Sequence, residues 1–223
     1  MCGRYALAVD GRALREAFRT VDSLPWRPRY NLAPSQEVPA VRLGDRGREL
    51  VLLRWGLVPR WAEDPRFGWR TVNARAETVD RKPAFREAFR RRRCLIPATG
   101  FYEWRRLDGR KQPYHVARRD GGLMAFAGLW ERWTGPGGER LESCTIVVTD
   151  APPPLAAVHG RMPVILGEAD HDRWLDPAAD PRVLRGLLRP CPAGRLAWWP
   201  VSARVNSPAQ DDPAFLEPVE AGA

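Results

Sequence analysis

The sequence predicts an α+β fold. A single domain is expected over residues 1–206, with an antiparallel, partly closed β-sheet or barrel as its core and short helices beside it, followed by a loosely attached tail over residues 207–223. One observation is that 22 prolines and 19 glycines are spread along the chain, as tight turns between short elements require. Another is a series of runs rich in β-branched and aromatic residues, which are typical of strands: 49–57, 94–98, 101–106, 113–118, 123–132, 142–149, 162–166 and 196–201.

Helical patterns are few and fall irregularly among these strands, which favours α+β. Asp10 is placed to cap a helix over residues 11–19. Pro83 fits the first turn of a second helix that ends near Arg92. Two shorter helices are predicted near residues 168–175 and 180–188.

The composition is that of an ordinary globular protein. Hydrophobic residues make up 44% and charged residues 28% of 223 residues, so a sizeable core can form and disorder is not expected. No apolar run reaches the roughly 18 residues that a membrane-spanning helix needs. The start of the chain lacks a basic segment followed by an apolar one, so we expect no secretory signal and a cytoplasmic location.

The charge balance favours a polyanionic partner. Lys and Arg number 36 against 27 Asp and Glu, a formal net charge of +9. Nucleic acid is the first candidate and an acidic membrane surface the second. Only Lys82 and Lys111 are lysines, so a coding background that favours Arg explains part of the pattern. Such a bias explains the choice of Arg over Lys better than it explains the excess of positive charge.

The four cysteines, Cys2, Cys94, Cys144 and Cys191, are widely spaced and lack nearby histidine pairs. This spacing does not favour a metal site, and a reducing cytosol does not favour a disulfide. Cys94 and Cys144 flank apolar strand-like runs and are expected in the core, whereas Cys191 lies between prolines in a predicted loop. We expect no metal, no organic cofactor and, by default, a monomer.

Cys2 has a chemistry of its own. The chain begins Met1–Cys2–Gly3–Arg4, and a small residue at position two permits removal of the initiator methionine. Cys2 would then carry an α-amine with a pKa near 7.7–8.0 and a thiol whose pKa, near 8.5 when free, falls beside cations such as Arg4. A 1,2-aminothiol condenses with an aldehyde to form a thiazolidine ring. Alternatively, the thiol attacks an amide while the amine serves as base.

Five further segments combine polar side chains with aromatics or prolines. Together with MCGRY at the start they resemble, in order and approximate spacing, the SOS response-associated peptidase family, or SRAP domain. The segments are RYNLAPS (29–35), WGLVPRW (55–61), TVNARAET (71–78), GFYEW (100–104) and VHGRMPVIL (158–166). Each is weak alone, but six in order over nearly the whole chain are highly specific.

This resemblance implies a function and a set of catalytic residues. Members of the family shield abasic sites in single-stranded DNA by a covalent thiazolidine crosslink through the N-terminal cysteine. Autoproteolytic loss of the initiator methionine is also attributed to them, and a lyase side reaction is expected from the imine intermediate. The family's catalytic groups map onto Cys2, Asn73, Glu103 and His159.

Physical arguments support a role for each polar residue. Glu103 lies between Tyr102 and Trp104, an apolar setting that raises a carboxyl pKa and suits proton transfer. His159 is expected to help open the sugar, and Asn73, which donates and accepts, to orient the amine or the deoxyribose. The alternatives are a solvent-facing glutamate, a structural histidine and an asparagine that caps a turn.

DNA binding is expected from arginines beside the catalytic groups, namely Arg4, Arg75 and Arg161, whose guanidinium groups suit phosphate. Residues 90–93 are all arginines. They are interpreted as a solvated helix end that adds a general attraction for DNA. Ala62 stands where family members often carry an aromatic residue. The candidate stacking platforms for bases, of which we select Trp61, are Trp55, Trp61, Trp69, Phe101 and Tyr102.

Two other functions remain open at this point. A Cys-Gly start also opens class II glutamine amidotransferases, which use the thiol on an amide and usually include a synthetase partner domain. A chain of 223 residues is short for an amidotransferase domain and a synthetase domain together. The second is a noncovalent single-stranded DNA-binding module in which Cys2 has no chemical role. Glutamine turnover favours the first, and equal affinity for intact and abasic DNA favours the second.

Overall fold

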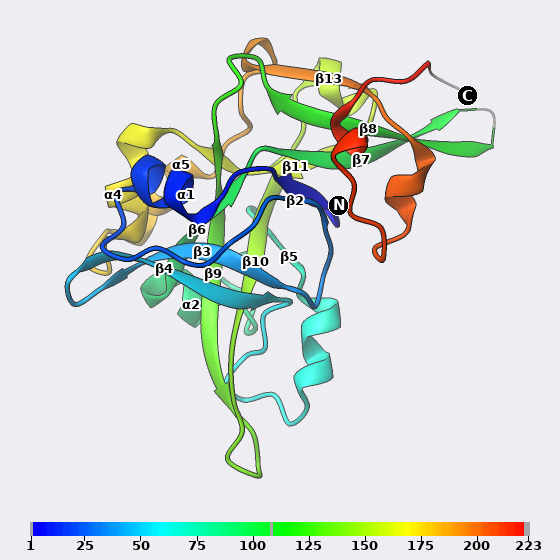
Figure 1. Cartoon of the computed structure of the whole chain (residues 1–223). Coiled ribbons are helices and arrows are strands. Elements are labelled where there is room, and N and C mark those ends of the chain that lie inside the picture. Colours follow the sequence, from blue (N-terminus) through cyan, green and yellow to red (C-terminus); the bar gives the residue numbers. More distant parts are fainter. Residues whose placement is uncertain (1, 108, 221–223) are drawn as a thin grey trace.

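The core of the molecule is a closed five-stranded barrel, seen in a computed structural model that describes residues 2–107 and 109–220 (Figure 1). β3 pairs with β4 and β6, β6 with β9, and β9 with β10, all antiparallel. A parallel pairing of β10 with β4 closes the ring. The predicted α+β class is confirmed, and the barrel is closed rather than partly open. Its strands are β3 (Glu37–Gly44), β4 (Gly47–Trp55), β6 (Arg93–Ala98), β9 (Met124–Thr134) and β10 (Arg140–Asp150).

A second, five-stranded antiparallel sheet lies next to the barrel, in the upper part of Figure 1. Its central strand β7 follows β6 after a single residue, so the chain passes directly from the barrel into this sheet. In spatial order its strands are β13 (Leu196–Pro200), β8 (Arg110–Arg118), β7 (Gly100–Leu107), β1 (Tyr5–Leu7) and β2 (Arg29–Leu32).

Short elements surround the two sheets. Three minor strands extend the barrel sheet: β5 (Asn73–Arg75), β11 (Arg161–Pro163) and β12 (Ile165–Leu166). The α-helices are α1 (Gly11–Phe18), α2 (Arg86–Arg91), α3 (Pro153–Ala156), α4 (His171–Leu175) and α5 (Pro181–Leu187). The 3₁₀ turns are η1 (Pro65–Arg70), η2 (Glu168–Asp170), η3 (Ala193–Arg195), η4 (Ala203–Asn206) and η5 (Pro213–Leu216).

The helix signals hold in part. The Asp10 carboxylate accepts the Ala13 N–H at 2.8 Å, which confirms the predicted cap of α1. The prediction that Pro83 opens α2 is wrong, because the chain turns around Lys82 and the helix begins only at Arg86. The predicted helix near 168–175 is split into η2 and α4.

Each predicted strand coincides with an observed one, and the run 162–166 is divided between β11 and β12. The sequence patterns missed β1, β2, β3 and β5. β3 contains Pro39, which argues against a strand in a sequence pattern, and β1 and β5 have only three residues each. Two of these missed strands, β1 and β5, position the candidate site residues Cys2 and Asn73.

β1 joins the two sheets. The Tyr5 ring, fully buried, packs edge-on against Trp55 of the barrel at 5.4 Å and against Phe126 of β9 at 5.9 Å. Cys94 and Cys144 are fully buried in the same core, as expected. The start of the chain is therefore held in the interior, between the barrel and the second sheet.

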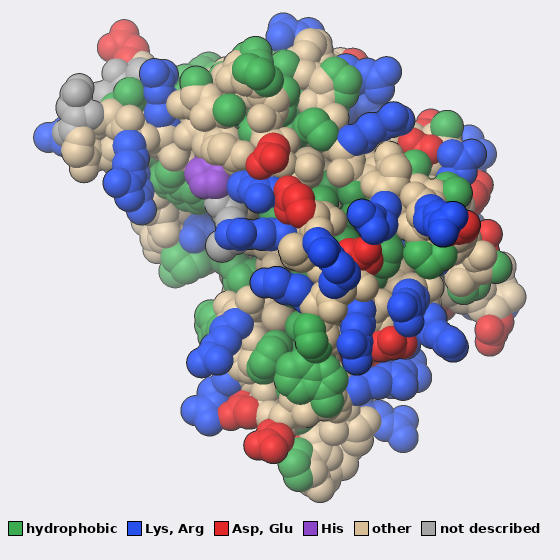
Figure 2. All heavy atoms as spheres, turned by 180° about the vertical axis from the view of Figure 1, so that it is seen from behind, with side chains coloured by type: hydrophobic (Ala, Val, Ile, Leu, Met, Phe, Trp, Pro, Cys, Tyr) green, Lys and Arg blue, Asp and Glu red, His purple; other side chains and the backbone are tan. Residues whose placement is uncertain are grey.

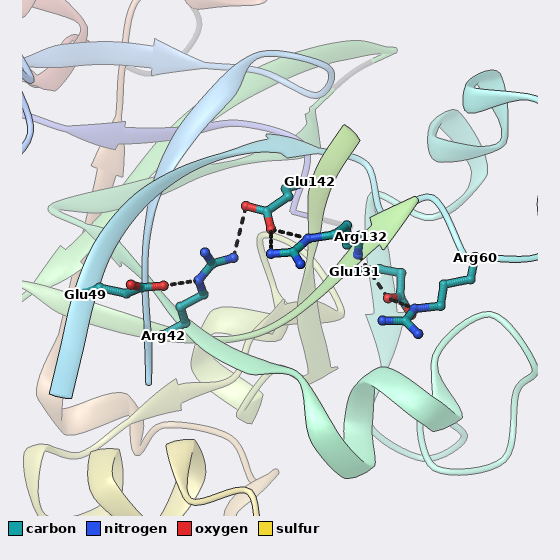
Figure 3. A network of polar contacts seen from close by, with 6 residues as sticks. All are labelled: Arg42, Glu49, Arg60, Glu131, Arg132 and Glu142. Carbon is teal, nitrogen blue, oxygen red and sulfur yellow. Dashed lines mark hydrogen bonds and ion pairs between the residues drawn. The ribbon is translucent and has the colours of Figure 1, made fainter. Parts of the chain in front are cut away.

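A network of charged side chains links four barrel strands (Figure 3). The Arg42 guanidinium contacts Glu49 at 2.5 Å and Glu142 at 3.0 Å, and Arg132 contacts Glu142 at 2.8 Å. Arg42 also lies 4.3 Å from the centre of the Trp130 ring. Since the Arg42 side chain is only 13% exposed, water screens these contacts less than it would on an open surface.

The stretch that follows residue 206 is packed, contrary to the expectation of a loose tail. Phe215 is fully buried in a cluster with Tyr102, Ala6, Val201 and Val205. The carbonyl groups of Ser207 and Gln210 accept from the side-chain amide of Asn31, at 2.9 and 2.7 Å. The tail prediction is therefore wrong for residues 207–220, while 221–223 lie outside the described residues.

Two absences hold for the part of the chain that the structure describes. None of its helices is long and apolar enough to span a bilayer. No group of three or more His, Cys, Asp or Glu side chains is arranged to hold a metal ion there.

Candidate functional site

Cys2 lies fully buried just before β1, and the pairing of β1 fixes its position. Tyr5 is opposite Phe101 of β7, and the Tyr102 N–H donates to the Arg4 carbonyl at 3.0 Å. This register brings the beginning of the chain alongside the part of β7 that carries Glu103. The three-residue strand β1 thus places the candidate nucleophile beside the candidate acid.

Asn73 reaches Cys2 from the other sheet. β5 pairs in parallel with β10, Asn73 opposite Ile146, and the Asn73 side-chain amide donates to the Cys2 carbonyl at 2.8 Å. The Asn73 Oδ1 is buried and has no hydrogen-bond partner among the described atoms. The side chain therefore holds the Cys2 backbone with one atom and offers an acceptor with the other.

His159 lies between α3 and β11, beside Glu103. Its Nδ1 is 3.6 Å from Glu103 Oε2. The same nitrogen is 3.1 Å from the Arg161 nitrogen and 3.2 Å from the Arg161 carbonyl oxygen. The Arg161 backbone can therefore hold the ring in either protonation state, since it provides both a donor and an acceptor.

The environment raises the pKa of Glu103 and lowers that of His159. Glu103 is 2% exposed, and burial raises the pKa of its carboxyl to about 7. Burial also lowers the pKa of the half-buried His159 imidazole below its ordinary value. A carboxyl that titrates near neutrality can both give and take a proton at physiological pH.

The pKa of the Cys2 thiol is raised well above its ordinary value, chiefly by burial and also by the nearby Glu103 carboxylate. The expectation that Arg4 lowers the pKa of this thiol is wrong. The Arg4 guanidinium donates instead to Asn31 Oδ1 at 2.9 Å and to the Val205 carbonyl at 2.6 Å. The thiol therefore needs a base at the moment it reacts.

Glu103 and His159 open into a pocket of about 450 Å³. Sequence reasoning missed the other residues that line it, although Arg106 and Lys111 face each other across the β7–β8 hairpin. The predicted strands 101–106 and 113–118 form this hairpin, so pairing them in the sequence could have shown that Arg106 and Lys111 are neighbours. The pocket thus has two catalytic candidates and a cationic edge, and its other lining residues are Trp104, Arg106, Lys111 and Asn206.

The three predicted phosphate-binding arginines differ in how available they are. Arg75 is exposed and forms no ion pair with a described residue. Arg161 is half-buried and is paired with Glu77 at 2.5 Å and with Asp150 at 3.4 Å. Arg4 is held by the partners given above. Figure 2 shows one face of the molecule, on which Lys and Arg side chains are spread around a hollow.

Of the candidate stacking platforms, Trp61 and Trp69 are 57% and 60% exposed. Trp61 packs edge-on against Phe67 at 5.1 Å. Ala62 is buried, and its carbonyl accepts from Trp133 Nε1 at 2.6 Å. The three others, Trp55, Phe101 and Tyr102, are buried in the core and are not platforms.

The arrangement of Cys2, Asn73, Glu103 and His159 agrees with a match over most of the sequence. Residues 1–208 match the family model described as SOS response associated peptidase (SRAP). The chain belongs to the SRAP family. The resemblance seen in six short segments is thereby confirmed, and the family's description as a peptidase indicates an enzymatic role.

Curated relatives of this SRAP chain are similar along most of its length. Abasic site processing protein YoqW of Bacillus subtilis (strain 168) is 41% identical over 222 residues, covering 97% of this chain and 99% of that protein. Abasic site processing protein HMCES of Gallus gallus is 34% identical over 267 residues, covering 100% of this chain and 79% of that protein. Both relatives are named for the processing of abasic sites.

Solved structures share the fold of this SRAP chain. A crystal structure of a protein from Bacteroides thetaiotaomicron superposes with a TM-score of 0.90 at 24% identity, covering 98% of this chain and 100% of that one. A second, from Bordetella bronchiseptica, gives a TM-score of 0.78 at 29% identity, covering 90% of this chain and 100% of that one. The barrel and its adjoining sheet are therefore a shared architecture.

Proposed function

We propose that this SRAP chain captures abasic sites in single-stranded DNA through a covalent bond to Cys2. The observation that carries the proposal is that Cys2, held by Asn73, lies near Glu103, which together with His159 lines a pocket with a cationic edge. The names of the curated relatives support the substrate. The net charge of +9 supports a nucleic-acid partner.

The reaction begins with removal of Met1, a residue outside the described part of the chain. Cys2 then carries its amine and thiol on adjacent carbons. The amine adds to the aldehyde of the opened abasic sugar, water leaves, and an imine forms. The sulfur adds to the imine carbon, the thiol proton is released, and the imine nitrogen gains a proton. The products are a thiazolidine ring and one water molecule.

Glu103 serves this sequence in both of its protonation states. With its pKa near 7, the acid form donates a proton to the hydroxyl that leaves as water. The resulting carboxylate then accepts the thiol proton, which the raised pKa of Cys2 makes necessary. A carboxyl with an ordinary pKa would be ionised throughout and would lack the first of these actions.

His159 and Asn73 prepare the sugar and the amine. The half-buried imidazole exchanges a proton with the sugar hydroxyl as the ring opens. The free Asn73 Oδ1 accepts a hydrogen bond from the Cys2 amine or from the sugar. Arg75 binds a flanking phosphate with its exposed guanidinium. The Arg4 guanidinium holds the Val205 carbonyl, and the Arg161 guanidinium is paired with the Glu77 carboxylate.

Ring closure decides between protection and cleavage of the strand. An imine withdraws electrons and permits β-elimination of the neighbouring phosphate, which is a lyase reaction. The thiazolidine has no such carbon–nitrogen double bond. The thiol therefore protects the strand, and the amine alone would leave the lyase side reaction open.

The test is denaturing gel electrophoresis of the methionine-processed protein with single-stranded DNA that contains one abasic site, without borohydride. Wild type is expected to give a heat-stable shifted band and Cys2→Ala none, with the N-terminus of each confirmed by mass spectrometry. A variant that retains Met1 is also expected to give none, because its Cys2 nitrogen is an amide. A stable adduct from Cys2→Ala would sink the thiazolidine mechanism. Equal binding of intact and abasic DNA by wild type, without any adduct, would favour a noncovalent module.

A further inference from the structure

A groove of about 280 Å³ lies between α2 and the segment that carries Trp61. We call it the α2 groove. Trp61 also lines a second hollow of about 470 Å³, together with Ala62, Phe67 and Arg70. The exposed indole therefore stands between two depressions. The α2 groove is lined by Pro59, Arg60, Trp61, Pro83, Ala84, Arg86, Glu87, Ala88, Arg91, Arg92 and Glu131.

The charge of the α2 groove is positive, with four arginines against two glutamates. Glu131 is 4% exposed, and both of its oxygens are occupied, by Arg60 at 3.0 Å and by Arg92 at 2.7 Å (Figure 3 shows the first contact). Its carboxylate therefore faces its arginines rather than a ligand. Glu87 lies 3.8 Å from Arg90, a residue outside the lining.

Two arginines of the groove are free to bind an anion. Arg86 and Arg91, at the two ends of α2, are exposed and form no ion pair or side-chain hydrogen bond with a described residue. The interpretation of residues 90–93 as one solvated helix end is wrong for Arg93. That side chain is 3% exposed and donates to the carbonyls of Phe89 and Trp174, each at 2.6 Å.

Polar contacts with the barrel strands hold the segment that presents Trp61. The Val58 N–H donates to Ser143 Oγ at 2.8 Å, and Trp133 Nε1 donates to the Ala62 carbonyl at 2.6 Å. Arg60 is tied to the buried Glu131. The backbone that presents the indole is therefore positioned before any ligand arrives, which lowers the entropy lost on binding.

We propose that the α2 groove binds phosphate groups of the DNA strand that continues past the base stacked on Trp61. The proposal rests on the proposed function, since it extends the path of the same strand away from Cys2. An exposed aromatic platform next to guanidinium groups without carboxylate partners is the combination that binds single-stranded DNA independently of sequence. The strand then follows Arg75, Trp61 and the α2 groove in turn.

The test compares two double variants with equal loss of charge. Arg86→Gln/Arg91→Gln empties the groove of its free arginines, and Arg12→Gln/Arg15→Gln removes two exposed arginines from α1. Affinity is measured by fluorescence anisotropy with oligonucleotides that carry a tetrahydrofuran abasic analogue. One has about two nucleotides on each side of the analogue, and the others are extended by about ten on the 5′ or the 3′ side.

We expect the groove variant to bind one extended oligonucleotide about three- to tenfold more weakly than wild type, with a salt slope lower by about 1.4 for two lost phosphate contacts. It should bind the short oligonucleotide as wild type does, and the α1 variant should bind all of them as wild type does. Equal losses on short and extended oligonucleotides, or no loss on either extension, would overturn the groove proposal. The tetrahydrofuran analogue cannot form the crosslink, so this assay measures noncovalent binding alone. The groove proposal can therefore fail or hold whether or not the Cys2 experiment gives an adduct.

Discussion

Glu103 is the residue on whose environment the proposed chemistry depends most. Its carboxyl lies on β7 and is only 2% exposed, so water hardly solvates the charged form. The protein thus keeps a carboxyl half-protonated at neutral pH, where an exposed glutamate would be fully ionised. The same burial that suits proton transfer also costs stability once the carboxyl ionises.

Glu103→Gln should stabilise the protein at alkaline pH and leave its stability at acid pH nearly unchanged. The pKa of Glu103 in the folded chain, about 7, lies above its ordinary value of 4.5. The folded state therefore binds the proton more tightly, and wild type loses stability as pH rises from about 4.5 through about 7. The loss is on the order of 3 kcal/mol. Urea unfolding at several pH values measures it, and parallel curves for both proteins would contradict the assigned pKa.

Asn73→Ala should slow crosslinking by roughly 10- to 100-fold while the fold is retained. The change removes the hydrogen bond to the Cys2 carbonyl and the free acceptor oxygen. One lost hydrogen bond at this half-buried position costs about 1 kcal/mol of folding free energy. Single-turnover crosslinking rates and thermal melting, measured side by side, separate the two effects. A rate equal to that of wild type would show that Cys2 is oriented without Asn73.

β1 and β5 explain which parts of the site could be predicted from the sequence. The long barrel strands β4, β9 and β10 show clear β-branched runs and were predicted nearly to their ends. The three-residue strands have no period to detect, because only their pairing with distant strands makes them extended. They nevertheless place Cys2 and Asn73, so the site residues came from the family resemblance and their arrangement required the structure.

Arg4 shows why a neighbour in sequence is a poor guide to electrostatics. It was expected to lower the pKa of the adjacent thiol, but its guanidinium is bonded to Val205, 201 positions along the chain. Glu103 is the opposite case. The sequence predicts a raised pKa for its carboxyl, and burial does raise it.

Phe215→Ala should cost about 3–5 kcal/mol, because the ring is fully buried and its removal leaves a cavity. The cavity lies against Tyr102, the neighbour of Glu103, so crosslinking should also slow. Urea unfolding and single-turnover crosslinking measure the two losses. Val219→Ala, a change in the same C-terminal stretch at a partly exposed residue, serves as the control. An unchanged midpoint for Phe215→Ala would mean that η5 contributes little to the fold.

The charge of the whole molecule should govern its affinity for DNA. With a net charge of +9 and about three to four phosphate contacts, a fourfold rise in salt should weaken binding of intact single-stranded DNA roughly 20- to 50-fold. Anisotropy titrations across a salt series give the slope directly. The rate of the covalent step at saturating protein should change little, since Glu103 and Cys2 are buried and poorly screened. A flat affinity profile would contradict phosphate-driven binding.

All four cysteines of the chain are free thiols, and all are buried. Oxidants and alkylating agents modify the thiolate, and they need access to it. Cys2 is enclosed, and burial raises the pKa of its thiol, so both requirements are poorly met. In the proposed reaction the sulfur therefore meets a sugar that is already docked and joined to the amine, and we expect peroxide and other small electrophiles to modify Cys2 slowly.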